Sequence, residues 1–260
     1  MSTEIAIKSS IKIALVTGAS RGLGRNTALN LARKGVDLII TYHSNRAEAD
    51  SAVAAIETLG RKAVALQLDS SDVSTFDAFV RNVAGALRSK WSRDRFDFLV
   101  NNAGTVAYAP FAETKESDFD QMVDIHLKGV FFLTQKLLPL LNDGGRIVNL
   151  SSGLARFATP GYSAYACMKG AIEVLTRYLA KELGPRGIAV NTVAPGAIET
   201  DFGGGVVRDN AELNKQVASI TALGRVGVPD DIGPMIASLL SDDNRWVTAQ
   251  RIEVSGGMVI

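Results

Sequence analysis

Three side chains that could handle a proton at a carbonyl or alcohol oxygen lie close together in the sequence: Ser152, Tyr165 and Lys169. Tyr165 and Lys169 are four residues apart in a segment with helical periodicity, so they share one face of the expected helix. A free tyrosine has a pKa near ~10, and a nearby ammonium group favours the phenolate and lowers that pKa. The spacing therefore predicts Tyr165 as a general acid or base, with Ser152 orienting the oxygen that exchanges the proton.

A glycine-rich turn follows the first apolar segment of the chain, between Thr17 and Gly24. Glycines let the backbone turn tightly and approach a pyrophosphate, and the N-terminus of the next helix offers free N–H groups. The position between a strand and a helix predicts dinucleotide binding rather than only a tight connection. The residues expected to contact the nucleotide here are Gly18, Ser20, Arg21, Gly22, Leu23 and Gly24.

Short apolar segments alternate along the chain with longer segments of helical period, which predicts strands alternating with helices. Continuously apolar strands are typical of a parallel sheet covered by helices on both faces. We therefore expect an α/β fold, a single doubly wound domain over residues 1–260 with about seven strands, because no linker or repeat marks a boundary. Gly35 and Gly60 are expected to end the first two helices. The expected strands are 11–17, 36–42, 62–68, 96–101, 146–151, 188–193 and 251–254, and the expected helices are 23–34, 47–59, 72–89, 117–141, 162–183 and 230–240.

Composition excludes several classes of protein. The chain has 260 residues, of which 47% are hydrophobic, too many for a disordered chain. Its 28 basic and 27 acidic residues leave a formal charge of +1, which argues against a nucleic-acid partner. No apolar run is long enough to span a membrane, and residues 1–12 lack the apolar stretch of a secretory signal. Cys167 is alone, so no intrachain disulfide is possible, which fits the cytoplasm; no metal site is expected.

The G-x-x-x-G-x-G spacing of the turn resembles that of the short-chain dehydrogenase/reductase family, and three further blocks follow in family order. The resemblance covers residues 11–257. It implies a Rossmann-type domain that transfers hydride between a nicotinamide cofactor and a ketone or secondary alcohol, commonly as a homotetramer. The overall pattern resembles that of 3-oxoacyl-thioester reductases. The three further blocks are Asn101–Gly104, Ser152 with Tyr165 and Lys169, and Pro195-Gly196 with Thr200.

The resemblance also implies contacts of individual residues with the cofactor. Asp69 and Ser70 would lie near the adenine ring, and Lys169, beside Tyr165, would hold the nicotinamide ribose. The other contacts that it implies are those of Asn102, Ala103, Gly104, Pro195, Gly196, Ile198 and Thr200.

The end of the second expected strand bears on the choice between NAD and NADP. An acidic residue there would accept the ribose hydroxyls of NAD, but Asp37, at about the right distance from the glycines, lies at the start of the strand. Together with Arg21, a polar strand end without a carboxylate predicts NADP(H) in preference to NAD(H), because charge and hydrogen bonds can hold the 2′-phosphate. That strand end reads Tyr42, His43, Ser44, Asn45 and Arg46.

Two other functions fit part of the pattern. Tyr162 lies seven residues before Lys169, the spacing of related enoyl-thioester reductases, which reduce C=C instead of C=O. Ser152 favours the arrangement with Tyr165, because a carbonyl-orienting serine goes with it. A non-catalytic NADP-binding sensor could keep the same fold, but the intact Ser152, Tyr165 and Lys169 speak against it.

His126 stands where the family usually has an asparagine, in the long helix before the fifth strand. With a pKa near ~6.5 an imidazole could relay protons, or the side chain could be packed and hydrogen-bonded without a catalytic role, and both interpretations remain open. Three consecutive glycines within residues 197–214 predict a mobile flap over the substrate. The candidate pocket residues are Leu154, Arg156, Phe157, Tyr162 and Phe202.

Overall fold

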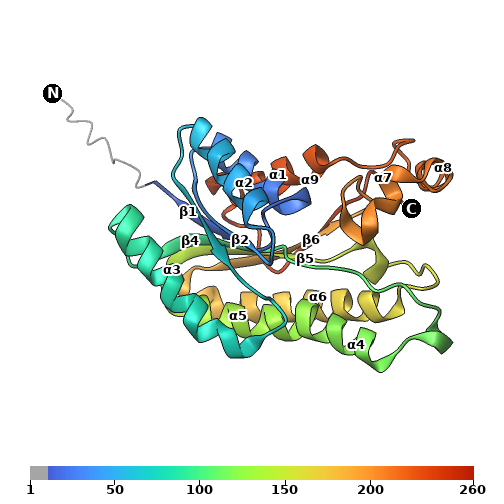
Figure 1. Cartoon of the computed structure of the whole chain (residues 1–260), viewed down its shortest axis with the longest axis horizontal. Coiled ribbons are helices and arrows are strands. Elements are labelled where there is room, and N and C mark those ends of the chain that lie inside the picture. Colours follow the sequence, from blue (N-terminus) through green and yellow to red (C-terminus); the bar gives the residue numbers. More distant parts are fainter. Residues whose placement is uncertain (1–10) are drawn as a thin grey trace.

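In a computed structural model that describes residues 11–260, the chain forms one seven-stranded parallel sheet with helices on both faces (Figure 1). The predicted α/β fold class is confirmed. Residues 1–10, which belong to the segment expected to carry no secretory signal, lie outside the described residues. The strands are β1 (Ile13–Val16), β2 (Asp37–Tyr42), β3 (Ala63–Gln67), β4 (Phe96–Asn101), β5 (Leu141–Leu150), β6 (Ala189–Pro195) and β7 (Arg251–Val254).

The strand order β3-β2-β1-β4-β5-β6-β7 reverses direction between β1 and β4. In such a sheet the connections leave β1 and β4 toward opposite sides, which opens a crevice at the carboxyl ends of these two strands. The crevice lies where the sequence places the glycine-rich turn and the Asn101–Gly104 block, because both follow directly after β1 and β4. The fold therefore brings the two predicted cofactor blocks to one place.

Helices cover both faces of the sheet, with α1, α2 and α9 on one side and α3, α4, α5 and α6 on the other (Figure 1). Gly35 and Gly60 follow the ends of α1 and α2 at φ +85° and +76°, as predicted. Within residues 11–260 none of the helices is both long and apolar enough to cross a membrane. The helices are α1 (Gly22–Arg33), α2 (Arg46–Thr58), α3 (Phe76–Trp91), α4 (Glu116–Val123), α5 (Gly129–Leu137), α6 (Ser163–Leu183), α7 (Val206–Asp209), α8 (Ala211–Ser219) and α9 (Pro229–Leu239).

The core consists of two apolar layers separated by the sheet. In β1, Ala14 and Val16 pack in the layer that includes residues of α1 and α9, whereas Ile13 and Leu15 pack in the layer that includes residues of α3 and α5. Successive side chains of a strand point to opposite faces, so a strand buried on both sides must be apolar at every position. This explains why the strands read as continuous apolar runs.

The prediction of a single helix over residues 117–141 is wrong. The chain forms α4, then one π-helical turn over Asp124–Lys128, then α5 and a 3-10 turn over Leu138–Leu140. A side chain at Gly129 would collide with the carbonyl oxygen of Ser70, so this close packing requires glycine. Pro139 cannot donate the helical hydrogen bond and ends the helix. Strand β5 starts at Leu141, five residues earlier than predicted, with an irregular register against β4.

The expected flap contains regular structure that the sequence analysis missed. After the three glycines, which have φ values of +61°, +76° and +77°, come the short helix α7 and then α8. Asn210 caps α8 by accepting a hydrogen bond from the Leu213 amide at 3.0 Å. The asparagine was a usable N-terminal signal for this helix.

Candidate active site

The glycine-rich turn joins β1 to the N-terminus of α1. Gly18 has φ +62°, and a Cβ there would lie 2.9 Å from the Cα of Ala103. A Cβ at Gly24 would collide with the carbonyl oxygen of Gly18. No side chain caps the first turn of α1 and no acidic residue occupies it. Close backbone packing therefore requires glycine at both positions, and the uncapped N–H groups at the start of α1 can bind a phosphate of the predicted nucleotide.

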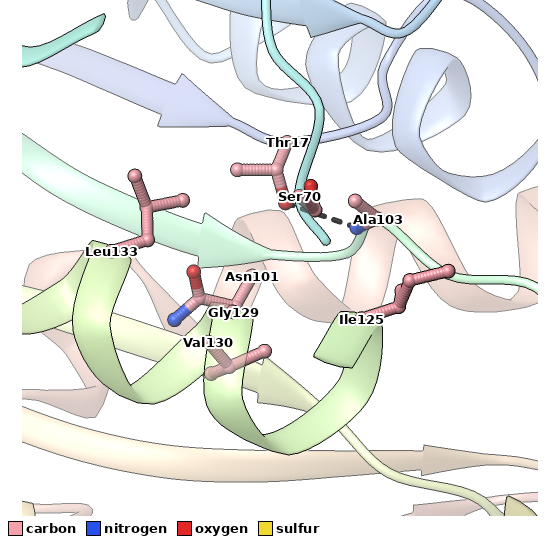
Figure 2. A pocket seen from close by; sticks show the side chains of 8 residues that line it. All are labelled: Thr17, Ser70, Asn101, Ala103, Ile125, Gly129, Val130 and Leu133. Atoms are coloured by element: carbon pink, nitrogen blue, oxygen red, sulfur yellow. Dashed lines mark hydrogen bonds between the residues drawn. The ribbon is translucent and has the colours of Figure 1, made fainter. Parts of the chain in front are cut away.

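The ends of β1 and β4 are held together by Thr17 and Asn102. The Thr17 hydroxyl oxygen accepts hydrogen bonds from the amides of Asn102 and Ala103, both at 2.9 Å, and the second is drawn in Figure 2. The Asn102 side chain donates to the carbonyl oxygens of Thr17 and Gly18 at 2.8 and 3.1 Å. The geometry therefore gives the Asn102 side chain a role in fixing the turn, next to its predicted contact with the cofactor.

A cavity of about 10 Å³, large enough for one water molecule, lies beneath this junction (Figure 2). The Oδ1 atom of Asn101 is buried and has no hydrogen-bond partner among residues 11–260. Its Nδ2 atom donates to Asn149 at 2.8 Å and to Thr134 at 3.0 Å. The lining residues are Thr17, Ser70, Asn101, Ala103, Ile125, Gly129, Val130 and Leu133.

The predicted 2′-phosphate region lies at the carboxyl end of β2. Asn45 caps α2 by accepting a hydrogen bond from the Glu48 amide at 3.2 Å, which leaves its amide group free. Arg46 forms an ion pair with Asp50 at 3.0 Å and lies 5.9 Å from the centre of the buried Tyr42 ring. Ser44 is exposed.

A carboxylate does lie near this strand end, contrary to what residues 42–46 alone suggested. Asp69 follows β3, and its Oδ2 atom lies 3.6 Å from Nε2 of His43. Its other oxygen accepts hydrogen bonds from the amide and hydroxyl of Ser71, which hold the pKa of Asp69 below its ordinary value. Asp69 is thus ionised and oriented at the position where an adenine ring was predicted.

Arg21, predicted to bind the 2′-phosphate, forms an exposed ion pair of 3.8 Å with Asp201 in the flap. Asp201 also accepts a hydrogen bond from Arg208 at 2.6 Å. Near Arg21, a Cβ at Gly22 would lie 3.9 Å from the Cβ of Thr200, which is buried. The flap therefore lies directly against the glycine-rich turn.

The P-G block begins at the end of β6. The Gly196 amide donates to the Val254 carbonyl oxygen at 3.1 Å, and Ile198 pairs with Gly227 in an isolated bridge. These contacts hold Pro195 and Gly196 beside β7 and Ile198 beside Gly227, from where the chain continues to Thr200.

Ser152, Tyr165 and Lys169 come together as predicted. Ser152 follows β5, and its hydroxyl oxygen accepts a hydrogen bond from the Leu154 amide at 3.2 Å while lying close enough to Tyr165 to lower the pKa of that phenol. The Nζ atom of Lys169 lies 5.4 Å from the centre of the Tyr165 ring and donates to the Leu150 carbonyl oxygen at 2.8 Å. Tyr165 and Lys169 are buried on one face of α6, whereas Cys167 is exposed. The four-residue spacing thus places the Tyr165 and Lys169 side chains on the same face of the helix, as expected.

The prediction that Lys169 lowers the pKa of Tyr165 fails in this structure. Burial raises the pKa of Tyr165 well above its ordinary value, and the hydrogen bond from Ser152 offsets only part of that rise. Burial also lowers the pKa of Lys169 to about 7. Both effects have one cause, because an apolar environment disfavours the charged form of each group. Tyr165 is therefore a protonated phenol at neutral pH.

His126 lies in the π-helical turn and is buried against Tyr165. The two rings are perpendicular with centroids 5.2 Å apart. Nε2 of His126 donates to the Thr105 carbonyl oxygen at 2.7 Å, and burial followed by the charge of Lys169 lowers the pKa of His126 to about 2. A Cβ at Gly104 would lie 2.7 Å from Cε1 of the imidazole. His126 is therefore a neutral, packed side chain, which favours the second of the two interpretations.

The candidate pocket residues separate into two groups. Leu154 packs in the cluster that contains Tyr165, Phe202 has its ring 6.0 Å from that of Tyr165, and Tyr162 is half-buried at the start of α6. Phe157 packs instead in a separate cluster with Val217, Val226 and Met258. Arg156 forms an ion pair of 2.7 Å with Glu253.

Sequence reasoning missed the ion-pair network behind Ser152. Arg251 donates to Glu173 at 2.6 Å and to the Ser152 carbonyl oxygen at 3.3 Å, and Glu173 also accepts the hydroxyl of Ser151. It also missed Tyr108, whose ring packs edge-on against Tyr162 at 5.2 Å. No local pattern in the sequence marks these residues, because their partners are distant along the chain.

Comparisons with known proteins agree with this arrangement. A family model described as enoyl-(acyl carrier protein) reductase matches residues 18–259. A 3-oxoacyl-[acyl-carrier-protein] reductase of Staphylococcus aureus is 37% identical over 249 residues, which cover 95% of this chain and 98% of the relative.

Two solved structures have nearly the same fold. The reductase LugOII, which catalyses keto-reduction at C1 during lugdunomycin biosynthesis, is 37% identical with a TM-score of 0.91 over 96% of this chain and 98% of its own. The angucycline C-6 ketoreductase LanV, solved with bound NADP, is 34% identical with a TM-score of 0.91 over 95% of each chain. The family match, the relatives and the shared fold agree with the four sequence blocks, and the chain belongs to the short-chain dehydrogenase/reductase family of oxidoreductases.

Proposed function

We propose that this protein is an NADP(H)-dependent oxidoreductase that transfers hydride between nicotinamide and a ketone or secondary alcohol, with Tyr165 as general acid and base. The observation that carries the proposal is the grouping of the half-buried Ser152 with the buried Tyr165 and Lys169. One flap connects this group to the glycine-rich turn, because Thr200 lies against Gly22 and Phe202 lies against Tyr165. A cofactor and a carbonyl group could therefore meet at Tyr165.

In the direction of reduction, a bound nicotinamide would supply the hydride to the carbonyl carbon. Ser152 would donate a hydrogen bond to the substrate oxygen and hold it near the Tyr165 hydroxyl. Tyr165 would donate its proton to that oxygen as the alcohol forms. The raised pKa keeps Tyr165 protonated at neutral pH, which is the form that donates the proton in reduction. Lys169 would hold the ribose, and Arg251 would keep Ser152 in position through its carbonyl oxygen.

The preference for NADP(H) over NAD(H) rests on Arg21 and on the absence of a carboxylate within residues 42–46. The NADP in the LanV structure supports it, since that chain is similar to this one over 95% of its length. Arg21 would exchange Asp201 for the 2′-phosphate. The remaining contacts that we propose are those of Gly18 to Gly24 after β1, of Asp69 and Ser70 after β3, and of Asn102 to Gly104 after β4.

The test is a comparison of two tyrosine variants, with NADPH oxidation in the presence of ketones as the readout. Tyr165→Phe removes the proposed acid and should lower kcat by about 100-fold or more, the usual contribution of general acid catalysis. Tyr162→Phe keeps the ring and removes a hydroxyl group that takes no part in the proposed proton transfer, so it should leave kcat within about threefold of the wild-type value. If Tyr162→Phe abolishes activity while Tyr165→Phe keeps it, the assignment is wrong.

That reversed outcome would point to the second candidate, an enoyl-thioester reductase that uses Tyr162. The description of the matching family model favours this candidate. The proximity of Ser152 to Tyr165, together with Lys169 beside the Tyr165 ring, favours the first. If the wild-type protein and both variants bind NADPH but reduce no ketone, the result would instead support the non-catalytic sensor.

Homo-oligomer formation and a cytoplasmic location are further parts of the proposal. Helices α5 and α6 expose Phe131, Val174 and Tyr178 around a hollow of about 320 Å³, and an apolar surface of this kind suits a second copy of the chain. The lone, free Cys167 suits a reducing compartment. We also propose that residues 197–214 move as a flap, because three consecutive glycines in the left-handed region can act as a hinge.

A further inference from the structure

Two pairs of aromatic rings lie in the region of Tyr165: Phe202 faces Tyr165 itself, and Tyr108 packs on Tyr162, three residues before Tyr165 on α6. Phe202 comes from the flap, with its ring centroid 6.0 Å from that of Tyr165 and an angle of 55° between the rings. Tyr162 comes from the N-terminal end of α6, and Tyr108 from the segment after β4, with their rings 5.2 Å apart and tilted by 66°. We call Tyr108, Tyr162 and Phe202 the aromatic rim.

Tyr108 and Phe202 of the rim are exposed, and Tyr108 is firmly positioned. Tyr108 and Phe202 keep 66% and 44% of their surface accessible, which is unusual for large apolar side chains beside a buried catalytic group. Tyr108 packs so closely over Gly161 that a side chain there would collide with its ring, and the Ala109 amide donates to the Gly161 carbonyl oxygen at 3.0 Å. Exposed aromatic rings held in place in this way lose little entropy when a ligand covers them.

The arginines that follow Ser152 and Phe202 in the chain are already paired. Arg156 uses its guanidinium group on Glu253 and on the carbonyl oxygens of Met258 and Val259. Arg208 is paired with Asp201 and Asp209. Carboxylates already compensate both guanidinium charges, so neither arginine adds a net positive charge that would favour the phosphate groups of a coenzyme A or carrier-protein thioester over an uncharged substrate.

We propose that the aromatic rim is a binding subsite for the flat aromatic ring of an uncharged cyclic ketone with a fused aromatic ring, which the protein reduces to the secondary alcohol. This inference rests on the proposed function and specifies its substrate class. The ring system would contact Phe202 and Tyr162 in offset or edge-on geometry, and its carbonyl oxygen would reach Ser152 and Tyr165. NADPH would give a hydride to the carbonyl carbon and become NADP⁺, and Tyr165 would give the proton to the oxygen, so that electrons and protons balance.

The experiment compares 2-tetralone with 2-decalone, two bicyclic ketones of similar size of which only the first has an aromatic ring. The wild-type protein should reduce 2-tetralone with the higher kcat/KM. Phe202→Leu keeps the apolar bulk and removes the ring, and it should lower kcat/KM for 2-tetralone by about 2- to 10-fold, the range for losing one or two aromatic contacts. The value for 2-decalone should change by less than about twofold. Phe111→Leu is the matched control, because Phe111 is 85% exposed and outside the rim.

Equal kcat/KM for the two ketones in the wild-type protein, or an equal loss for both in Phe202→Leu, would overturn the aromatic subsite and leave the proposed reductase function standing. A much higher kcat/KM for acetoacetyl-N-acetylcysteamine than for 2-tetralone would overturn it as well. If no ketone oxidises NADPH, the proposed function fails. Calorimetric binding of 2-tetralone and 2-decalone to the NADP⁺ complex, in the wild-type and Phe202→Leu proteins, then tests the subsite by itself.

Discussion

The buried ammonium group of Lys169 should make the cofactor-free protein less stable at lower pH. Lys169 is 5% exposed and forms no ion pair with the carboxylates of residues 11–260. Burial lowers its pKa from 10.5 to about 7. Between these two values the unfolded chain binds the proton and the folded protein releases it, so stability rises with pH across that interval.

The size of the effect follows from the shift of the Lys169 pKa. At pH 6 both states carry the proton, and holding it in the buried site costs about 5 kcal/mol, at 1.36 kcal/mol for each unit between about 7 and 10.5. At pH 9 the folded protein has released the proton and the cost falls to about 2 kcal/mol. The wild-type protein should therefore gain about 2.5 to 3 kcal/mol from this residue between pH 6 and pH 9.

Lys169→Met removes the charge and keeps an unbranched side chain. It loses the hydrogen bond to Leu150, worth about 1 kcal/mol, but at pH 6 it should be more stable than the wild-type protein by several kcal/mol. This advantage should shrink by about 2.5 kcal/mol at pH 9. Activity should be lost, since Lys169 belongs to the proposed machinery.

Urea unfolding followed by circular dichroism measures both proteins from pH 6 to pH 9, without cofactor and at one protein concentration. Lys181→Met is the control, because Lys181 is exposed on the same helix and its replacement should leave the pH dependence unchanged. Parallel stability curves for Lys169→Met and the wild-type protein would refute the reasoning, because a buried ammonium group cannot leave the pH dependence unaffected.

Three further predictions concern other side chains. His126 should contribute about 3 kcal/mol to the loss of wild-type stability between pH 6.5 and pH 4, because the unfolded chain protonates this histidine and the folded state keeps it neutral down to about pH 2. His126→Asn should remove that contribution, as measured by urea unfolding. An unchanged dependence of stability on pH would contradict the burial argument. Asp201→Asn should tighten NADPH binding by about 2- to 5-fold and leave NADH binding unchanged, because it frees Arg21 from an exposed ion pair. Fluorescence titration measures the binding of both cofactors. Equal changes for both would argue against Arg21 at the 2′-phosphate. Val174→Glu should shift the protein to a species of lower mass, because it places a charge in the apolar hollow of α5 and α6. Size-exclusion chromatography with light scattering measures the mass. An unchanged mass would place any subunit interface elsewhere.

Much of the fold could be predicted from sequence because it depends on neighbours along the chain. The strands are continuous apolar runs, and β4 and β7 have the predicted bounds. The π-helical turn could not be predicted, because it depends on the packing of Gly129 against Ser70, far away in sequence. Helix α8 carried a local signal in Asn210 that the glycine-rich context obscured.

The sequence by itself determined which side chains can do chemistry: the glycines of the turn, and the spacing that puts Tyr165 and Lys169 on one helix face. The tertiary structure decided their protonation, because burial depends on residues from several distant segments and disfavours every charged form. It also decided their partners. Arg156 is a candidate pocket residue in the sequence and an ion-pair partner in the fold, because Glu253, 97 residues away, reaches its guanidinium group. Local spacing carries no information on such contacts, since only the folded chain brings the two residues together.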